Sequence, residues 1–274
     1  MFSIKKIIKN NKKRNNNSIN TFHSFPFGKK PWADSQTYLS IWKEEKKNNY
    51  PIINDVESKL GLSISKDWFH DLALHTQVVI KKSKICYQHG RLLYVKLSDY
   101  CMKKKYDTIN ILETGTARGF SALCMAYALS ERKVSGKIIS IDPLPHNVPM
   151  YWNCIDDLQG VKTRKQLLEN YSDLIEKYIL FFEGKSKHIL RTIESTRINF
   201  AFLDGAHEYE DVKYEINYVS KRQKSGDIIF FDDYQKKYFP GIVKAVQELQ
   251  TDGHYTVETI IANDQRGYAI AEKK

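Results

Sequence analysis

The chain has 274 residues, a length that suits one α/β domain with an N-terminal extension. Hydrophobic residues make up 42% of it and charged residues 27%, as in a globular protein, and no apolar run is long enough to span a membrane. The net charge of +11 falls to +3 when the eight basic residues of segment 1–30 are removed, so we expect no nucleic-acid binding by the remainder.

Residues 1–30 contain no acidic residue and show no hydrophobic periodicity. We interpret them as a flexible basic leader. Their isoleucines are separated by lysines, so the continuous apolar stretch of a signal peptide is not formed. The four cysteines have neither C-x-x-C nor zinc-site spacing, which favours reduced thiols and a cytoplasmic location; they are Cys86, Cys101, Cys124 and Cys154.

Between residues 31 and 106 the hydrophobic pattern is helical, and we predict an N-terminal helical cap. The residues that carry this spacing are Trp68, Leu72 and Val79, followed by Leu93, Leu97, Tyr100 and Cys101. Aromatic residues precede the cap at Phe25, Phe27 and Trp32. We expect this region to form a lid over a binding site or the contact surface of a homodimer.

From residue 107 to residue 274 short β-branched runs alternate with amphipathic helices. The predicted strands are 109–112, 137–141, 179–182, 198–203 and 227–231, followed by a hairpin of 254–261 and 267–271. Helices are predicted around Tyr209–Val219 and Ile242–Leu249. The strands lack polar alternation, so both of their faces are buried, which predicts a Rossmann-like, doubly wound parallel sheet covered by helices.

Each of the five predicted parallel strands ends at an acidic residue. These residues are Glu113, Asp142, Glu183, Asp204 and Asp232. In open α/β sheets, ligands bind outside the carboxyl ends of the strands. Because buried carboxylates are costly without partners, this edge of the sheet is the predicted site.

The loop after the first strand reads ETGTARG and differs from the G-x-G-x-x-G pattern that binds a pyrophosphate. Its leading acid, Glu113, would repel a pyrophosphate but can hold the cationic methionine end of S-adenosylmethionine (SAM). Ala117 stands where such loops have a glycine, which is tolerable if its φ is negative. The predicted cofactor contacts here are Glu113, Thr114, Gly115, Thr116, Ala117, Gly119 and Ser121.

Further cofactor contacts are predicted after the second and third strands. Asp142, followed by Pro143, can accept hydrogen bonds from both ribose hydroxyls, although NAD would use the same carboxylate. Gly184 and Ser186 are placed to border an adenine. The structural alternatives are that Asp142 caps a turn and that Ser186 caps a helix.

The segments FLDGAHEY and FFDDY would bring Asp204, Asp232 and Asp233 together at neighbouring strand ends. Such carboxylates repel one another unless a cation joins them, and their oxygens suit a divalent ion such as Mg²⁺, which would activate an acceptor hydroxyl. Asp204 would also border the cofactor. The alternative is that these residues cap loops without a metal.

His207 lies at the predicted start of a helix, where the helix dipole disfavours a protonated imidazole. We therefore expect it to be neutral near pH 7 and to act as a general base. The alternative is a hydrogen bond at the helix start.

Together these residues resemble class I SAM-dependent methyltransferases over about residues 107–274. ETGTARG is similar to their first motif and IISIDP to their second-strand acidic motif. FLDGAHEYEDV with FFDDY is similar to the signature of metal-assisted O-methyltransferases of the caffeoyl-CoA and macrocin type. The resemblance implies a seven-stranded sheet of order 3-2-1-4-5-7-6 with the last strand antiparallel. It also implies SAM near Glu113, Gly115, Asp142 and Ser186, and a divalent ion at Asp204, Asp232 and Asp233.

The acceptor is expected to be a small molecule with a hydroxyl group, first a sugar and second a phenol. The connection Pro143–Gly160, which contains Tyr151 and Trp152, is suited to covering such a ring. The alternatives are an NAD-dependent oxidoreductase, a nucleic-acid methyltransferase and a non-catalytic nucleotide-binding protein with the same fold.

Overall fold

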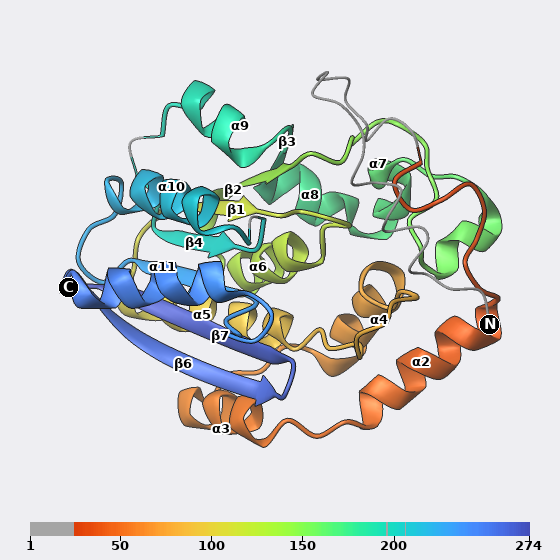
Figure 1. Ribbon diagram of the computed structural model, residues 1–274, viewed down its shortest axis with the longest axis horizontal. Coiled ribbons are helices and arrows are strands. Elements are labelled where there is room, and N and C mark those ends of the chain that lie inside the picture. The colour runs from red at the N-terminus through yellow and green to blue at the C-terminus, as the bar shows by residue number, and fades with distance from the viewer. Residues whose placement is uncertain (1–24, 196, 206) are drawn as a thin grey trace.

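In residues 25–195, 197–205 and 207–274, which the computed structural model describes, seven strands form one mixed sheet. Its order is β3-β2-β1-β4-β5-β7-β6, with helices on both faces (Figure 1). The strands are β1 (Thr108–Thr114), β2 (Ser135–Asp142), β3 (Ile179–Glu183), β4 (Phe200–Leu203), β5 (Ile228–Phe231), β6 (Tyr255–Asn263) and β7 (Arg266–Lys273). The predicted sheet and strand order are confirmed.

Strands β1 to β5 pair in parallel, and β7 pairs antiparallel with both β5 and β6. Alternate residues of each central strand enter two different apolar cores. In β4, Phe200 and Phe202 face one core, whereas Ala201 and Leu203 face the other. Because both faces are covered, every residue of this strand is apolar and buried, which explains the absence of polar alternation.

The helices cover both faces of the sheet and extend beyond one of its ends. They are α2 (Ser35–Lys47), α3 (Pro51–Leu60), α4 (Lys66–Thr76), α5 (His89–Lys104), α6 (Phe120–Glu131), α7 (Arg164–Leu167), α8 (Ser172–Tyr178), α9 (Ser186–Thr192), α10 (Tyr209–Ser220) and α11 (Pro240–Thr251). Short 3₁₀ turns lie at Ile155–Gln159 and Glu169–Tyr171. Helices α5, α6 and α8 contribute to one core and α9, α10 and α11 to the other.

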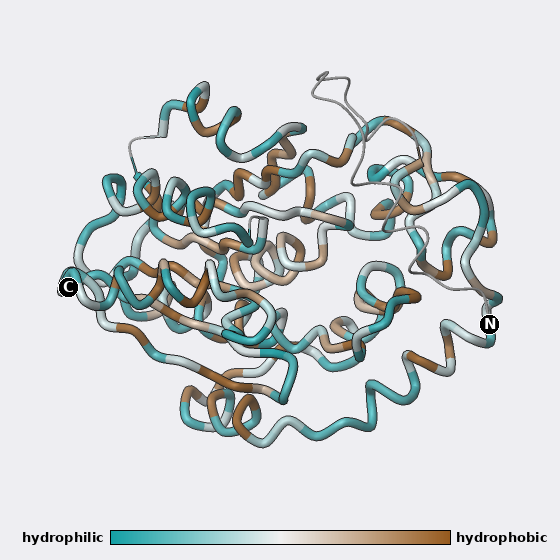
Figure 2. Tube along the Cα trace, in the orientation of Figure 1, coloured by the Kyte–Doolittle hydropathy of each residue, from teal (hydrophilic) through white to brown (hydrophobic). Residues whose placement is uncertain are grey.

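The predicted N-terminal cap contains α2 to α5. Helix α5 packs against α6, and its residues Leu93 and Leu97 share a core with the sheet. The predicted helical spacing from Trp68 to Val79 is only partly correct, because α4 ends at Thr76 and Val79 lies in the following loop. Figure 2 shows hydrophobic residues concentrated on the strands and the helices beside them, while the outlying α2 is mostly hydrophilic.

The predicted leader lies mainly outside the described residues, since the structure describes only its residues 25–30. Phe27 in this part packs against Trp152, with ring centroids 6.2 Å apart. Phe25 and Trp32 are exposed. Within the described ranges, no helix is long and apolar enough to cross a bilayer.

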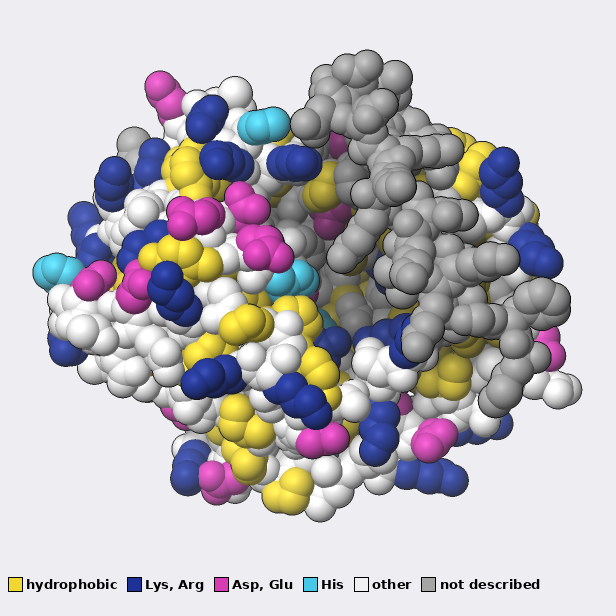
Figure 3. Space-filling model, in the orientation of Figure 1, with side chains coloured by type: hydrophobic (Ala, Val, Ile, Leu, Met, Phe, Trp, Pro, Cys, Tyr) yellow, Lys and Arg dark blue, Asp and Glu magenta, His cyan; other side chains and the backbone are white. Residues whose placement is uncertain are grey.

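Helices α2 and α4 and the connection between β2 and α8 lie beyond the end of the sheet to which the parallel strands point (Figure 1). Figure 3 shows the molecule hollowed near its centre, with histidine and basic side chains at the edges of the hollow. The topology therefore brings together the carboxyl ends of the strands and segments from the N-terminal half of the chain.

Candidate active site

A cavity of about 450 Å³ lies at the carboxyl ends of β1, β2 and β4. It has apolar walls from Ile141 and Pro143 and polar groups from Thr114 and Ser186. Gly115, which also lines it, has a φ of +90°, and a Cβ at this residue would lie 2.3 Å from the carbonyl oxygen of Asp204. Glycine is therefore required where the first loop meets the end of β4.

Asp142 holds the first loop and the β2 connection together. Its Oδ2 accepts a hydrogen bond from the Ala117 N–H at 2.8 Å, and its Oδ1 accepts one from the Leu144 N–H at 2.6 Å. The turn-capping alternative for Asp142 is thus observed. Each carboxylate oxygen still has a second lone pair, so ribose hydroxyls can share it.

Glu113, a predicted cofactor contact, is wholly buried. Its two carboxylate oxygens accept hydrogen bonds from the hydroxyls of Ser121 and Ser140. Burial raises the pKa of Glu113 to about 7, and the two serine hydroxyls offset part of the increase. Glu113 and Ser121 therefore brace the loop from behind instead of facing the cavity.

The remaining first-loop residues, Thr116, Gly119 and Ala117, have different structural settings. Thr116 is buried, and its hydroxyl lies 2.5 Å from that of Ser140. Gly119 is the N-cap residue before α6, with a φ of +96°, and its missing side chain leaves room for Leu168. Ala117 has a φ of +45°, so the expectation of a negative φ is wrong. A left-handed alanine costs about 1–2 kcal/mol, which its hydrogen bond to Asp142 helps to offset.

Buried Arg164 was not foreseen from the sequence. Its Nε donates to the Ala117 carbonyl at 3.0 Å and its Nη2 to the Leu144 carbonyl at 3.2 Å. The guanidinium lies 5.6 Å from the ring centroid of Trp152 and 5.5 Å from that of Phe181. Trp152 has no exposed surface, so the expectation that it covers an acceptor ring is wrong.

The third-strand residues take the positions expected near the cavity. Ser186 lines it as the first residue of α9, whereas the cap position belongs to Lys185, without a side-chain capping bond. Gly184 has a φ of +147° and donates its N–H to the Asp142 carbonyl at 2.9 Å. Glu183 lies exposed at the end of β3.

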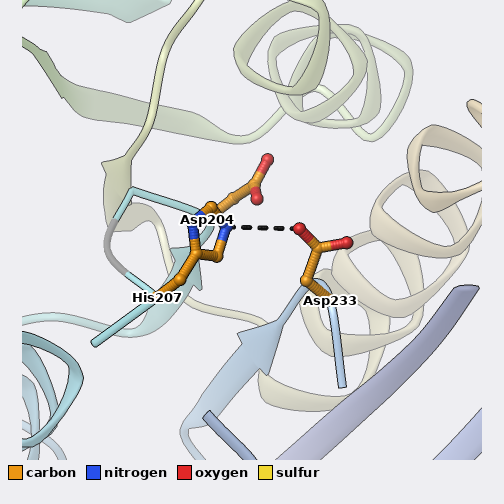
Figure 4. A group of neighbouring side chains, drawn as sticks. All are labelled: Asp204, His207 and Asp233. Carbon is orange, nitrogen blue, oxygen red and sulfur yellow. Dashed lines mark ion pairs between the residues drawn. The ribbon is translucent and has the colours of Figure 1, made fainter. Parts of the chain in front are cut away.

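Three of the residues predicted to be catalytic or to bind the metal form a compact group at the ends of β4 and β5. One ligand atom each of Asp204, His207 and Asp233 lies within 4.8 Å of the other two (Figure 4). His207 Nε2 is 3.2 Å from Asp233 Oδ2. Burial and the neighbouring carboxylates raise the pKa of Asp204 well above its ordinary value. The predicted clustering of Asp204 with Asp233 is therefore present, and like charges at this distance repel one another.

Asp232, the other predicted metal ligand, lies outside this compact group. It is buried, and its Oδ1 accepts a hydrogen bond from the Asp233 N–H at 2.7 Å. Its Oδ2 is 4.0 Å from Nδ1 of His89, a buried residue at the start of α5. Burial, then the charge of Asp233, raises the pKa of Asp232 to about 6.

His207 differs from the expectation of a neutral imidazole. Its pKa is raised, first because it hydrogen-bonds to Asp233, although burial acts in the opposite direction. Burial also acts to raise the pKa of Asp233, but His207 and Arg266 outweigh it, so that pKa is lowered. The hydrogen bond to Asp233 thus has a larger effect on the pKa of His207 than the dipole of α10, which begins two residues later at Tyr209.

Arg266, at the start of β7, and Glu215, in α10, also belong to the site and were not predicted. Arg266 Nη1 contacts Asp233 Oδ1 and lies 3.8 Å from Asp232 Oδ1. Glu215 is buried behind the cavity wall, where its Oε2 accepts a hydrogen bond from the Thr114 hydroxyl at 3.1 Å. Its buried Oε1 has no hydrogen-bond partner among the described residues.

We predict that Glu215→Gln changes how stability depends on pH. Burial raises the pKa of Glu215 to about 7 from an ordinary 4.5, so wild-type stability decreases as the pH rises through this interval. The glutamine variant has no carboxyl group to ionise at this position, so its stability does not decrease in this way. Urea unfolding should therefore find it close to wild type at pH 5 but more stable by about 2 kcal/mol at pH 8. A constant difference across this range, or one shared by the exposed Glu176→Gln control, would contradict the prediction.

We also predict that Ala117→Gly retains or slightly increases stability. Glycine relieves the positive φ, which offsets its usual entropic cost of about 0.5–1 kcal/mol. Thermal unfolding should show an unchanged or higher midpoint. The half-exposed Ala262 in β6 is the control, since Ala262→Gly has no left-handed conformation to relieve and should lower the midpoint. Equal losses in the two variants would refute this.

Comparisons with known proteins agree with this architecture. Residues 112–234 match the family model described as a methyltransferase domain, and no curated protein matches the chain. The structure is similar to the O-methyltransferase TomG of Streptomyces achromogenes, involved in tomaymycin synthesis and solved with SAM. The TM-score is 0.53 at 15% identity, covering 80% of this chain and 95% of TomG.

Two further solved structures have the same fold. The O-methyltransferase NovP gives a TM-score of 0.53 at 14% identity, covering 86% of this chain and 99% of NovP. An O-methyltransferase from Bacillus cereus, solved with SAH, gives a TM-score of 0.51 at 13% identity. The match covers 87% of this chain and 99% of that protein. Residues 112–234, which carry both the cavity and the carboxylate group, thus match a methyltransferase-domain model, within a chain that has the fold of class I SAM-dependent methyltransferases.

Proposed function

We propose that the protein transfers a methyl group from SAM to a hydroxyl of a small molecule. The observation that carries the proposal is the position of the Asp204, His207 and Asp233 group directly beside the cavity at Gly115. A methyl donor in the cavity and a hydroxyl at this group would be neighbours. The names of the structural neighbours TomG and NovP, both O-methyltransferases, support an oxygen acceptor.

The cavity fits the cofactor in size and chemistry. Its volume of about 450 Å³ lies within the usual range for small-molecule sites. Ile141 and Pro143 supply apolar wall for an adenine, while Thr114 and Ser186 supply hydroxyls. Bound SAM supplies a methyl group on a positively charged sulfur.

The donor set also fits a divalent ion. Asp204 and Asp233 offer carboxylate oxygens, with Asp232 immediately behind them, and hard cations such as Mg²⁺ prefer oxygen ligands. Such an ion would lower the pKa of an acceptor hydroxyl. We therefore propose that Asp204 and Asp233 hold the ion, consistent with the resemblance to metal-assisted O-methyltransferases.

His207 is the proposed base. Its Nε2 faces Asp233, so this carboxylate orients the ring and stabilises it when protonated. The Nδ1 atom can then take the proton from the acceptor hydroxyl. The acceptor oxygen forms its bond to the methyl carbon as the carbon–sulfur bond breaks, which leaves neutral SAH. Alignment of the two reactants would contribute most of the rate.

The acceptor class that we propose is a sugar hydroxyl, with a catechol-like phenol as the second candidate. The face opposite the sheet edge is formed by the loop between α4 and α5 and by the β2–α8 connection. Asn153 of the connection joins them, since its side chain bonds both the N–H and the carbonyl of Ile80 at 3.0 Å. A side built from loops that polar contacts hold together supports an acceptor rich in hydroxyls as the first candidate.

The cofactor assignment predicts SAM binding without NAD binding. Calorimetric titration of the purified protein with SAM, with and without Mg²⁺, should give a micromolar dissociation constant, while NAD gives no heat above dilution. Failure to bind SAM under either condition would refute the proposed function. A response to NAD would instead favour an oxidoreductase with this fold.

The assignment of Asp204 predicts that Asp204→Ala abolishes transfer. With Mg²⁺ and labelled SAM, transfer to a panel of sugars and catechols should decrease about 100-fold or more because both ion and acceptor lose a carboxylate. Asp252→Asn, an exposed change after α11, is the matched control. Full activity of Asp204→Ala would exclude the metal role of this residue.

A further inference from the structure

Arg266 is placed at the carboxylate group by a tightly docked hairpin. The β6–β7 hairpin returns to the end of β5, and the Tyr234 N–H donates to the Gly267 carbonyl at 2.8 Å. A Cβ at Gly267 would lie 2.3 Å from the Tyr234 carbonyl oxygen, so only glycine permits this approach. The backbone beside Arg266 is therefore held against the segment that carries Asp233.

The guanidinium of Arg266 competes for the same carboxylates as a metal ion. Its Nη1 contacts Asp233 Oδ1 and is 3.8 Å from Asp232 Oδ1, and its side chain is only 21% exposed. Because His207 contacts the other oxygen of Asp233, both oxygens of this carboxylate already face cationic donors. Charge-assisted contacts of this kind are about twice as strong as neutral hydrogen bonds.

The positive charge of Arg266 affects the pKa of every carboxylate in the group. It acts to lower the pKa of Asp204, of Asp232 and of Asp233, and so opposes the burial of these three carboxylates. A divalent ion bound between Asp204 and Asp233 would stand close to this fixed positive charge. At such distances two cations in a partly buried site repel each other.

We propose that Arg266 is a built-in counter-ion that holds the carboxylate group together without a metal and weakens its affinity for divalent cations. This inference rests on the proposed metal site. It implies that the group is preformed in the metal-free protein and that the ion exchanges readily. Arg266 would thus tune metal affinity, while the carboxylates provide the ligands.

Binding of Mn²⁺ to the full chain tests the proposal without any assay of activity. Calorimetry should find that Arg266→Gln binds Mn²⁺ about tenfold or more tightly than wild type, since a competing charge-assisted contact is lost. Without metal, Arg266→Gln should have a lower melting temperature, and saturating Mn²⁺ should raise it by more than in wild type. Arg266→Lys, which keeps the charge, should bind Mn²⁺ with an affinity close to wild type.

Lys81→Gln is the matched control for overall charge. Lys81 lies on the exposed loop between α4 and α5, near enough to Asp232 and Asp233 to influence their electrostatics. If this variant gains as much Mn²⁺ affinity as Arg266→Gln, the gain comes from the overall charge and not from the loss of the Arg266 contact, which would contradict the proposal. Unchanged or weaker Mn²⁺ binding by Arg266→Gln would overturn the inference. SAM titration of the same samples separates these results from failure of the proposed function, in which wild type binds no SAM.

Discussion

The site depends on one backbone contact, the approach of Gly115 to Asp204. The Asp204 N–H donates to the Thr114 carbonyl at 3.0 Å, and no side chain would fit between the two segments. This contact follows directly from the parallel register of β1 and β4, in which Thr114 is paired with Leu203. It places the first loop and the fourth strand end side by side, so the cavity and the carboxylate group share a boundary.

Electrostatics divides the acidic residues of this edge into two kinds. Glu113 and Glu215 are buried, and each receives hydrogen bonds from neighbouring hydroxyls, so they stabilise loops and can carry a proton. Asp204 and Asp233 instead belong to the compact group at the ends of β4 and β5, with Arg266 and His207 close to Asp233. Carboxylates at the same sheet edge therefore serve different roles because their partners differ.

Much of the fold was predictable because strand periodicity and burial are local properties of the sequence. Apolar runs such as Phe200–Leu203 require two covered faces, and the acidic strand ends locate the site. The orientation of side chains was harder to predict from the sequence. The burial of Glu113 and the positive φ of Ala117 depend on how the loop packs, and the raised pKa of His207 depends on a partner 26 positions along the chain.

Arg266 and Glu215 were missed for different physical reasons. Arg266 had a usable signal, because a strand that pairs antiparallel with β5 must begin beside the end of β5, where Asp232 and Asp233 follow. Glu215 had none, since a glutamate on an amphipathic helix normally faces solvent. Only the packing of α10 against β4 directs it toward Thr114.

The proposed acceptor side is built on a different principle from the proposed cofactor side. The cofactor cavity is formed by the sheet edge, where strand register fixes each residue. The opposite side is formed by loops from distant parts of the chain, joined through Asn153 and Ile80. Loops tolerate substitution far better than paired strands. Changes there can alter the acceptor while the sheet edge, and with it the methyl donor and the carboxylate group, keeps its geometry.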